Sequence, residues 1–163
     1  MWAFLAELGR ASVEPTTAYL VGGASAVLNG WRRTTIDVDL YLEPERDELL
    51  RTIPGLKERL QINIELASPL DFLPPLPGWR DRSRYVSQEG KLTVRDFDFY
   101  AQALAKLERG FAQDLRDVSA MIARGLVSPP ELERLFNVIS DQLYRFPAVD
   151  GAALRSELTR LAR

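Results

Sequence analysis

A short apolar segment that stops at two consecutive glycines constrains the fold of this chain more than any other feature. Residues 18–21 are Ala-Tyr-Leu-Val, and Gly22 and Gly23 follow directly. This pattern predicts a buried strand that runs into a tight turn, and residues 25–29 then predict a short helix that ends at Gly30. The chain is therefore expected to form a strand-to-helix turn in its N-terminal third.

A second strand is predicted over residues 35–41, where apolar and polar side chains alternate. Asp37 and Asp39 share one face of this strand, and their Cα atoms are expected about 6.5–7 Å apart. That spacing suits two carboxylates that grip one or two divalent ions, although the two acids are equally compatible with the solvated face of an ordinary sheet. The opposite face, which we expect to be buried, carries Ile36, Val38 and Leu40.

The composition limits the chemistry that such a site can perform. The 163 residues include no histidine and no cysteine, so catalysis must use carboxylates, hydroxyls, Lys, Arg and backbone amides. A metal ion, if one takes part, should be a hard ion held by oxygen, such as Mg²⁺. The net charge of −2 argues against a generally cationic nucleic-acid binder, so no DNA duplex is expected as a partner.

The remaining patterns predict an α/β (α+β) fold, a mixed sheet flanked by helices with a helical C-terminal extension. A helix is expected over residues 2–10 with Trp2 and Leu5 on its buried face, another around 45–52, and a strand over 62–66. A proline-rich loop spans 69–78. Further along, we expect a hairpin from 85–87 and 92–97, and helices that begin near 99, 114, 128 and 150.

This pattern divides the chain into an α/β core, residues 1–98, and a helical extension, residues 99–163, which together could also form a single domain. No apolar run is long enough to span a bilayer, and the first residues lack the basic stretch of a secretion signal. We therefore expect a cytoplasmic protein that does not bind membranes.

Residues 19–25, Tyr-Leu-Val-Gly-Gly-Ala-Ser, and residues 32–40, Arg-Arg-Thr-Thr-Ile-Asp-Val-Asp-Leu, resemble the minimal nucleotidyltransferases of the DNA polymerase β superfamily. Within that superfamily, the second segment is most similar to the AbiEii-type toxin family and related uncharacterised nucleotidyltransferases. The resemblance implies that Gly22 and Gly23 bind nucleotide phosphates and that Asp37 and Asp39 bind Mg²⁺ or Mn²⁺. Ser25 is either a phosphate contact or a helix cap.

The same resemblance implies a third carboxylate on a later strand, which would accept a proton from the incoming hydroxyl or bind metal. Glu65 is the first choice because it alternates with apolar neighbours one helix after the two aspartates. Asp98, between two phenylalanines, is the rival. Either residue could instead be a plain surface acid.

Four charged residues further along complete the resemblance. Similar enzymes carry a lysine, often with an arginine, before a pair of acids, and Lys106, Arg109, Asp114 and Asp117 match that order. Lys106 would then contact the triphosphate, and one of the two acids would position it or act in catalysis. The alternative is that these residues form ion pairs between two helices.

Two arginine-containing segments are candidates for substrate contacts. Arg32 and Arg33 lie close to the two aspartates in sequence, and either orient them, bind phosphates or remain solvated. Residues 79–85 place three arginines at a period of two beside two aromatic residues. That segment could bind an RNA backbone and stack a base, or form a solvated strand edge.

Together these patterns predict a Mg²⁺-dependent nucleotidyltransferase that moves a nucleoside monophosphate from an NTP to a hydroxyl. The resemblance implies that this hydroxyl belongs to RNA, such as tRNA, or to protein. The resemblance implies a toxin–antitoxin or phage-defence setting, with a possible cognate toxin or antitoxin as partner. Two other hypotheses stay open: an inactive nucleotidyltransferase-like binding module, and an enzyme that modifies small molecules.

Overall fold

The structure is a computed structural model that describes residues 1–162. The chain forms two compact units, one from Met1–Ser68 and Ser83–Phe97, the other from Pro69–Arg82 and the described residues from Asp98 onward. In chain order the elements are α1 (Trp2–Ala11), β1 (Thr16–Val21), α2 (Gly22–Leu28), β2 (Asp37–Glu43), α3 (Asp47–Leu60), β3 (Asn63–Leu66), the 3₁₀ turn η1 (Pro69–Asp71), α4 (Trp79–Arg82), β4 (Tyr85–Glu89), β5 (Leu92–Asp96), α5 (Phe99–Arg109), α6 (Ala112–Ala123), α7 (Pro129–Ile139), the 3₁₀ segment η2 (Ser140–Arg145) and α8 (Gly151–Leu161).

The first unit is built on one five-stranded mixed sheet with the strand order β3-β2-β1-β5-β4. β1 pairs antiparallel with β2 and parallel with β5, while β3 pairs parallel with β2 and β4 pairs antiparallel with β5. The mixed α/β architecture predicted from the sequence is thereby confirmed. β2 lies between β1 and β3, so residues of β2 can meet groups from both neighbouring strands.

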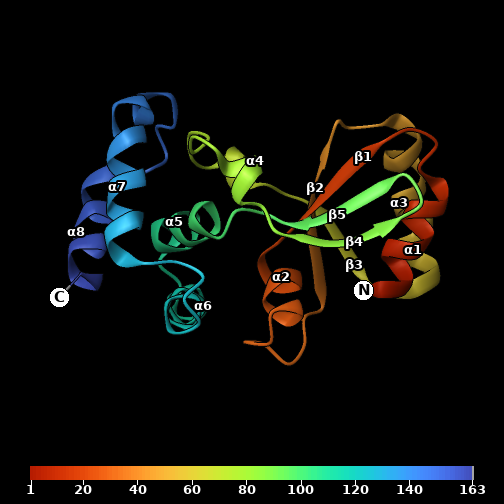
Figure 1. Ribbon diagram of the computed structural model, residues 1–163, viewed down its shortest axis with the longest axis horizontal. Helices are drawn as coiled ribbons and strands as arrows, with labels where there is room; N and C mark the ends of the chain where they lie inside the picture. The colour runs from red at the N-terminus through yellow and green to blue at the C-terminus, as the bar shows by residue number, and fades with distance from the viewer. Residues whose placement is uncertain (163) are drawn as a thin grey trace. The chain divides into compact units, whose positions relative to one another are not determined.

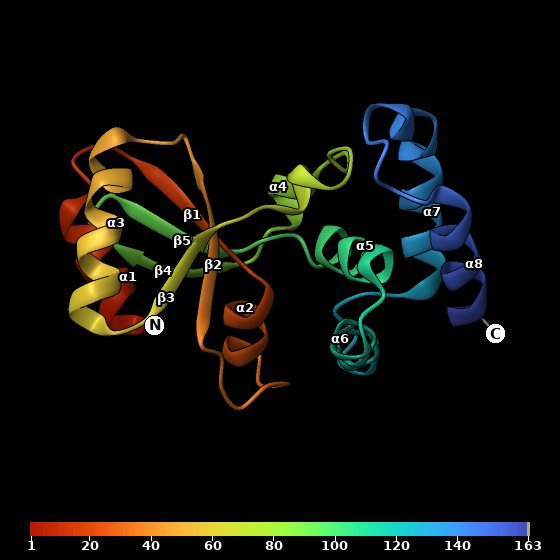
Figure 2. The same cartoon turned by 180° about the vertical axis from the view of Figure 1, so that it is seen from behind.

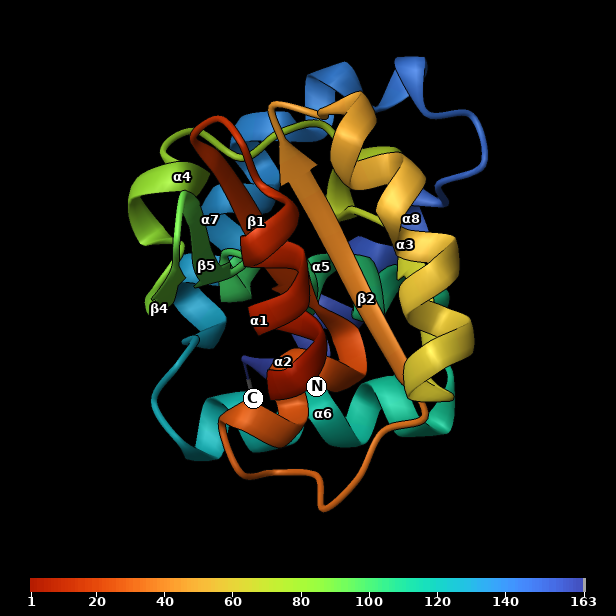
Figure 3. The same cartoon turned by 90° about the vertical axis from the view of Figure 1, so that its right-hand side faces the viewer.

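The core of the first unit lies between one face of the sheet and the helices α1 and α3, which pack against each other. Figures 1 and 2 show both helices on the same side of the sheet, and Figure 3 shows them in front of β1 and β2. The core side chains include Phe4, Leu5, Leu8, Leu20, Val38, Leu40, Leu49, Ile53, Leu56, Ile64 and Val94. Because burial of one such side chain stabilises the fold by about 1.5–3 kcal/mol, this face fixes which side of each strand points outward.

The second unit is helical. Asp98 caps α5 by accepting a hydrogen bond from the backbone N–H of Tyr100 at 3.2 Å, and α5 ends at Gly110 in the left-handed conformation. α5 packs against α6, α7 and α8 (Figure 2). Asp150 caps α8 through hydrogen bonds from the two N–H groups of Ala152 and Ala153.

Most of the predicted elements are confirmed, including the helix over 2–10, the strands over 18–21 and 62–66, the hairpin over 85–97 and the helices after residue 99. Several element boundaries differ from the prediction. α2 begins at Gly22 rather than Ser25, and Gly22 itself has a φ of +59°, in the left-handed region that favours glycine. α3 continues to Leu60 through Pro54, and the proline-rich segment includes the short turn η1.

Two residues predicted to be buried are exposed. Ile36 has the correct parity for the core face but is 83% exposed, because β2 begins one residue later and neither neighbouring strand pairs with Ile36. Trp2 is 52% exposed, and Phe4 takes its place in the core. An apolar residue at the alternation expected for the core face is therefore still exposed when it lies beyond the end of the sheet.

Candidate functional site

The outward face of β2 carries the two aspartates of the predicted site. Asp37 and Asp39 are half-buried and alternate with Val38 and Leu40, which are buried in the core. Strand geometry alone places both carboxylates on the same side of the sheet. The paired arrangement predicted from the sequence is therefore present in the first unit.

β3 adds a third carboxylate and an amide to this face. In the parallel pairing of β2 with β3, Glu65 is the register partner of Asp39 and Asn63 is the register partner of Asp37. The amide nitrogen Nδ2 of Asn63 donates to Asp37 Oδ1 at 2.7 Å and to Glu65 Oε1 at 3.0 Å. Asn63 thus bridges two carboxylates on neighbouring strands, a role that the sequence patterns did not predict.

The diglycine turn lies directly against this face. The last residue of β1, Val21, is the register partner of Asp39, and Gly22 follows it. A methyl group on Gly22 would come within 2.5 Å of Asp39 Oδ2, and the φ of +59° at Gly22 also favours glycine. A methyl group on Gly23 would collide with the hydroxyl of Thr35. The two glycines are thus required by close approaches on both sides of the turn.

Ser25 is fully buried within α2 and is not its N-cap, which is Val21. The Ser25 hydroxyl donates to Asp96 Oδ1 at 2.6 Å, and the amide of Asn29 donates to Asp96 Oδ2 at 2.9 Å. Burial raises the pKa of Asp96, against the opposing effects of the hydrogen bonds from Asn29 and Ser25 and of the charge of Arg84. Asp96, which the sequence analysis overlooked, therefore joins the end of β5 to α2.

The second unit contains the other charged residues singled out from the sequence. Lys106 is buried, and its ammonium lies 3.2 Å from Asp114 Oδ1 and 2.7 Å from Asp117 Oδ2. Arg109 also pairs with Asp114, at 2.7 Å. We call these four residues the Lys106 cluster. They connect α5 with α6, as the ion-pair hypothesis expects.

Asp98, the alternative third carboxylate, is buried at the start of α5, where it pairs with Arg82 at 2.7 Å in addition to capping the helix. It belongs to the second unit, whereas Glu65 is exposed beside Asp39 in the first. The structure thus brings Glu65, and not Asp98, into register with the strand of the two aspartates.

The arginine-rich segment 79–85 does not form a strand edge as a whole. Residues 79–82 form the helical turn α4, so the period-two pattern does not apply to them. Trp79 is buried with the guanidinium of Arg80 over its ring at 4.5 Å, and Arg82 is engaged by Asp98. Only Tyr85 begins a strand, and it is 60% exposed.

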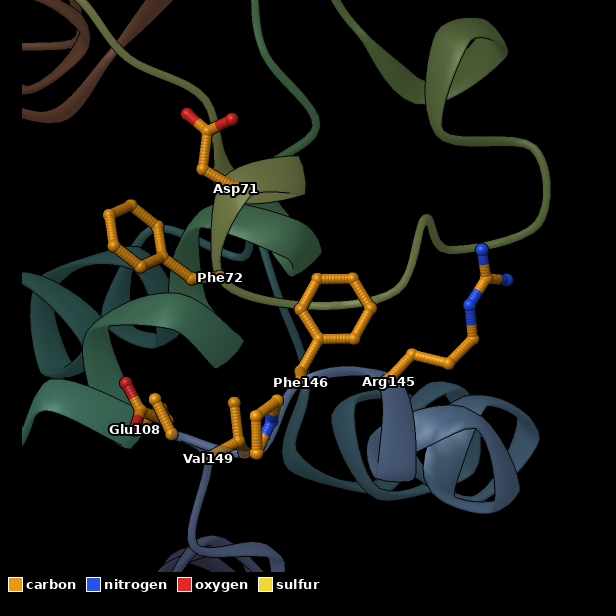
Figure 4. A pocket seen from close by; sticks show the side chains of 8 residues that line it. Asp71, Phe72, Glu108, Arg145, Phe146 and Val149 are labelled. Atoms are coloured by element: carbon orange, nitrogen blue, oxygen red, sulfur yellow. The ribbon is translucent and has the colours of Figure 1, made fainter.

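A hollow of about 300 Å³ lies within the second unit (Figure 4). It is lined by Asp71, Phe72, Glu108, Arg145, Phe146, Pro147, Ala148 and Val149. Of its charged side chains, Asp71 and Arg145 are exposed and Glu108 is half-buried, and they carry both signs of charge. The lining consequently does not define one class of ligand.

The oxygen atoms on the outward face of β2 and β3 are of the kind that Mg²⁺ prefers. Within residues 1–162, however, no group of three or more acidic side chains is arranged so that it could hold a metal ion by itself. Asn63 occupies the position between Asp37 and Glu65. An ion would accordingly need further oxygen ligands, which a bound phosphate can supply.

A mixed sheet with two aspartates on one strand face, one of them against a diglycine turn, is the arrangement expected of a nucleotidyltransferase-like fold. Residues 4–149 match the family model described as "Nucleotidyltransferase of unknown function (DUF6036)". The match spans most of the chain, so the chain belongs to this family. Comparisons with curated proteins and with solved structures gave no match. Among the described residues, no helix combines the length and the apolar character needed to cross a membrane.

Proposed function

We propose that this protein transfers a nucleoside monophosphate from an NTP to a hydroxyl group. The observation that carries the proposal is the position of Asp39, whose carboxylate lies against Gly22 while Asp37 shares its strand face. Acids that bind a cation and a backbone turn that approaches a phosphate closely are the two parts that nucleotidyl transfer requires.

Asp37 and Asp39 would hold Mg²⁺ or Mn²⁺ together with phosphate oxygens of the nucleotide. When bound, such an ion polarises the phosphate and neutralises charge that develops on the leaving group. Asn63 keeps the Asp37 carboxylate in a fixed orientation through its 2.7 Å hydrogen bond. Hydrogen bonds of this kind to metal ligands commonly affect metal affinity or activity by about 10- to 100-fold.

The reaction forms a bond between the acceptor oxygen and the α-phosphorus. The bond from the α-phosphorus to the oxygen that bridges to the β-phosphorus breaks, and pyrophosphate leaves with that oxygen. Glu65 is exposed and is the register partner of Asp39, a position suited to accepting the proton that the acceptor hydroxyl loses. Gly22 and Gly23 would let the backbone of the turn approach the phosphates closely, because neither carries a side chain.

The acceptor we propose is a hydroxyl of RNA, such as tRNA, or of a protein, within a toxin–antitoxin or phage-defence system in the cytoplasm. This finer assignment is supported by the resemblance of residues 32–40 to AbiEii-type toxins. Lys106 as a triphosphate contact also stays a prediction, because in the structure its ammonium contacts Asp114 and Asp117.

Incubation of the protein with α-³²P-labelled NTPs, Mg²⁺ or Mn²⁺, total tRNA and cell protein tests the activity and identifies the acceptor class. We expect label in one macromolecular fraction, and no label with Asp37→Ala. Label that persists in the Asp37→Ala variant would refute the catalytic assignment. Label found only on small molecules would favour an enzyme that modifies such compounds.

Thermal unfolding separates an active enzyme from an inactive binding module. If the site is active, the melting temperature of the protein should rise only when metal and nucleotide are both present, since a ligand stabilises the folded state that binds it. Asp39→Asn should remove that rise. A protein that melts at the same temperature with and without both ligands would contradict the proposed function.

A further inference from the structure

The connection between α2 and β2 returns the chain to the diglycine turn. Gly30, with a φ of +78°, permits the reversal after α2. The N–H groups of Trp31 and Arg32 then both donate to the carbonyl of Ala26, at 3.1 and 3.3 Å. These bonds fix the backbone of Arg32 beside α2.

Thr35 fixes the other end of the connection. Its hydroxyl donates to the carbonyl of Asp37 at 2.8 Å and accepts from the N–H of Asp37 at 3.3 Å. The same hydroxyl lies against the Cα of Gly23, where it would collide with any added methyl group. The connection therefore packs on the turn at a defined place.

This packing brings the guanidinium of Arg32 to the turn. Arg32 Nη1 lies 3.5 Å from the position that a Cβ atom would take on Gly23, whereas the carboxylate of Asp39 lies on the side of Gly22. Arg32 is half-buried, and its neighbour Arg33 is exposed. The turn is thus flanked by a carboxylate at its first glycine and by a guanidinium at its second.

We propose that Arg32 binds the β- and γ-phosphates of the nucleotide and thereby makes the site selective for nucleoside triphosphates. The assignment rests on the proposed function, in which Asp37 and Asp39 act at the α-phosphate. A guanidinium presents its N–H groups in a planar fork that matches two phosphate oxygens and keeps its charge at every physiological pH. Arg32 would accordingly hold the pyrophosphate group while the α-phosphorus is transferred.

The test compares the affinities for a triphosphate analogue and for the monophosphate of the same nucleoside. The α,β-methylene analogues of ATP, GTP, CTP and UTP and the corresponding monophosphates are titrated calorimetrically, in Mg²⁺, into the full chain and its variants. Arg32→Ala should weaken binding of the triphosphate analogue by about 10- to 100-fold, the range expected for loss of charge-assisted hydrogen bonds, and binding of the monophosphate by less than about twofold. Arg32→Lys should recover part of the loss.

Arg51→Ala is the matched control, because Arg51 is 84% exposed on α3, where it forms a long ion pair with Asp47 at 3.9 Å. It should bind every nucleotide as the wild type does. Far-ultraviolet circular dichroism of each variant verifies that the chain is folded, and Arg32→Lys serves in place of Arg32→Ala if the latter does not fold.

Three outcomes would overturn the assignment. If Arg32→Ala weakens the binding of triphosphate and monophosphate equally, Arg32 stabilises the segment between α2 and β2 and does not bind the β- and γ-phosphates. A phosphate-dependent loss in Arg33→Ala but not in Arg32→Ala would transfer the role to Arg33. If the wild-type protein binds no nucleotide in Mg²⁺, the proposed function itself is wrong. In the first two outcomes the wild-type protein does bind nucleotide, so they contradict only the role of Arg32.

Discussion

Closely spaced aspartates occur in both units of this protein, but the fold places the two pairs in opposite environments. Asp37 and Asp39 lie half-buried on a strand face, and the contact of Asp37 with β3 is the neutral amide of Asn63. Asp114 and Asp117 are buried and enclose the ammonium of Lys106. Partly solvated acids on one face retain the capacity to bind a cation, whereas buried acids around a lysine have their counter-charge within the fold.

The largest effect on activity is expected from a change at the strand face that carries Asp37 and Asp39. Asp39→Asn should lower nucleotidyl transfer by about 1,000-fold or more, because it removes several kcal/mol of transition-state stabilisation at the metal site. The half-buried position predicts little change in the melting temperature. Transfer of label from NTP, measured beside thermal unfolding, checks both expectations. A variant that unfolds as readily as it loses activity would make Asp39 a structural residue, and the contrast between the two regions would disappear.

Lys106→Ala should have the opposite signature. Removal of one partner from a buried ion pair typically costs about 3–5 kcal/mol, and here it takes the ammonium away from Asp114 and Asp117, of which Asp114 keeps its ion pair with Arg109. Chemical denaturation measures this loss, and Lys57→Ala, at a half-buried site on α3, is the control that should change stability little. If the Lys106→Ala variant is as stable as the wild type but binds NTP more weakly, Lys106 contacts the triphosphate, as the resemblance implies.

Two glycines provide a sharper comparison within the first unit. Gly22→Ala must adopt a positive φ and place a methyl group against Asp39, so we expect a loss of about 1–2 kcal/mol in stability together with weaker nucleotide binding. Gly55→Ala, inside α3, meets no atom within 4 Å and should stabilise the protein by up to about 1 kcal/mol. Equal responses of the two variants in a urea titration would contradict the requirement for glycine at the turn.

The smallest effect concerns Asp96. Its pKa in the folded protein is raised by burial, so the folded state binds the proton more tightly than the unfolded state. The stability of the wild type relative to Asp96→Asn should therefore increase as the pH falls from neutral through the raised pKa, and level off below the ordinary carboxyl range. Urea unfolding at a series of pH values measures this difference. A difference independent of pH would mean that the pKa of Asp96 is the same in the folded and unfolded states.

The sequence was sufficient for the parts of the site that follow from local pattern. Alternation over 35–41 predicts the shared face of Asp37 and Asp39, and two glycines after an apolar run predict the turn. The same local rule was wrong for Ile36, since alternation carries no information about where pairing with β1 and β3 ends.

Residues whose role depends on distant pairing were not found from the sequence. Asn63 could have been suspected, because it lies two residues before Glu65 on the same strand face. Asp96 gave no such signal, since its partner Ser25 is 71 residues away. The ion pairs of Lys106, in contrast, agree with the alternative drawn from the sequence, and the packing of α5 on α6 shows which acids Lys106 contacts.

The course of the chain between the units limits how the gene can be divided. Residues 69–82 belong to the second unit, although β4 and β5 of the first unit follow them, so the chain passes between the units three times. A fragment that stops after β5 would carry Leu73, Leu76 and Trp79, buried side chains of the second unit, without α5, α6, α7 and α8 of that unit. Neither unit is encoded by one continuous segment of the gene. We therefore expect homologues to keep or lose the two units together.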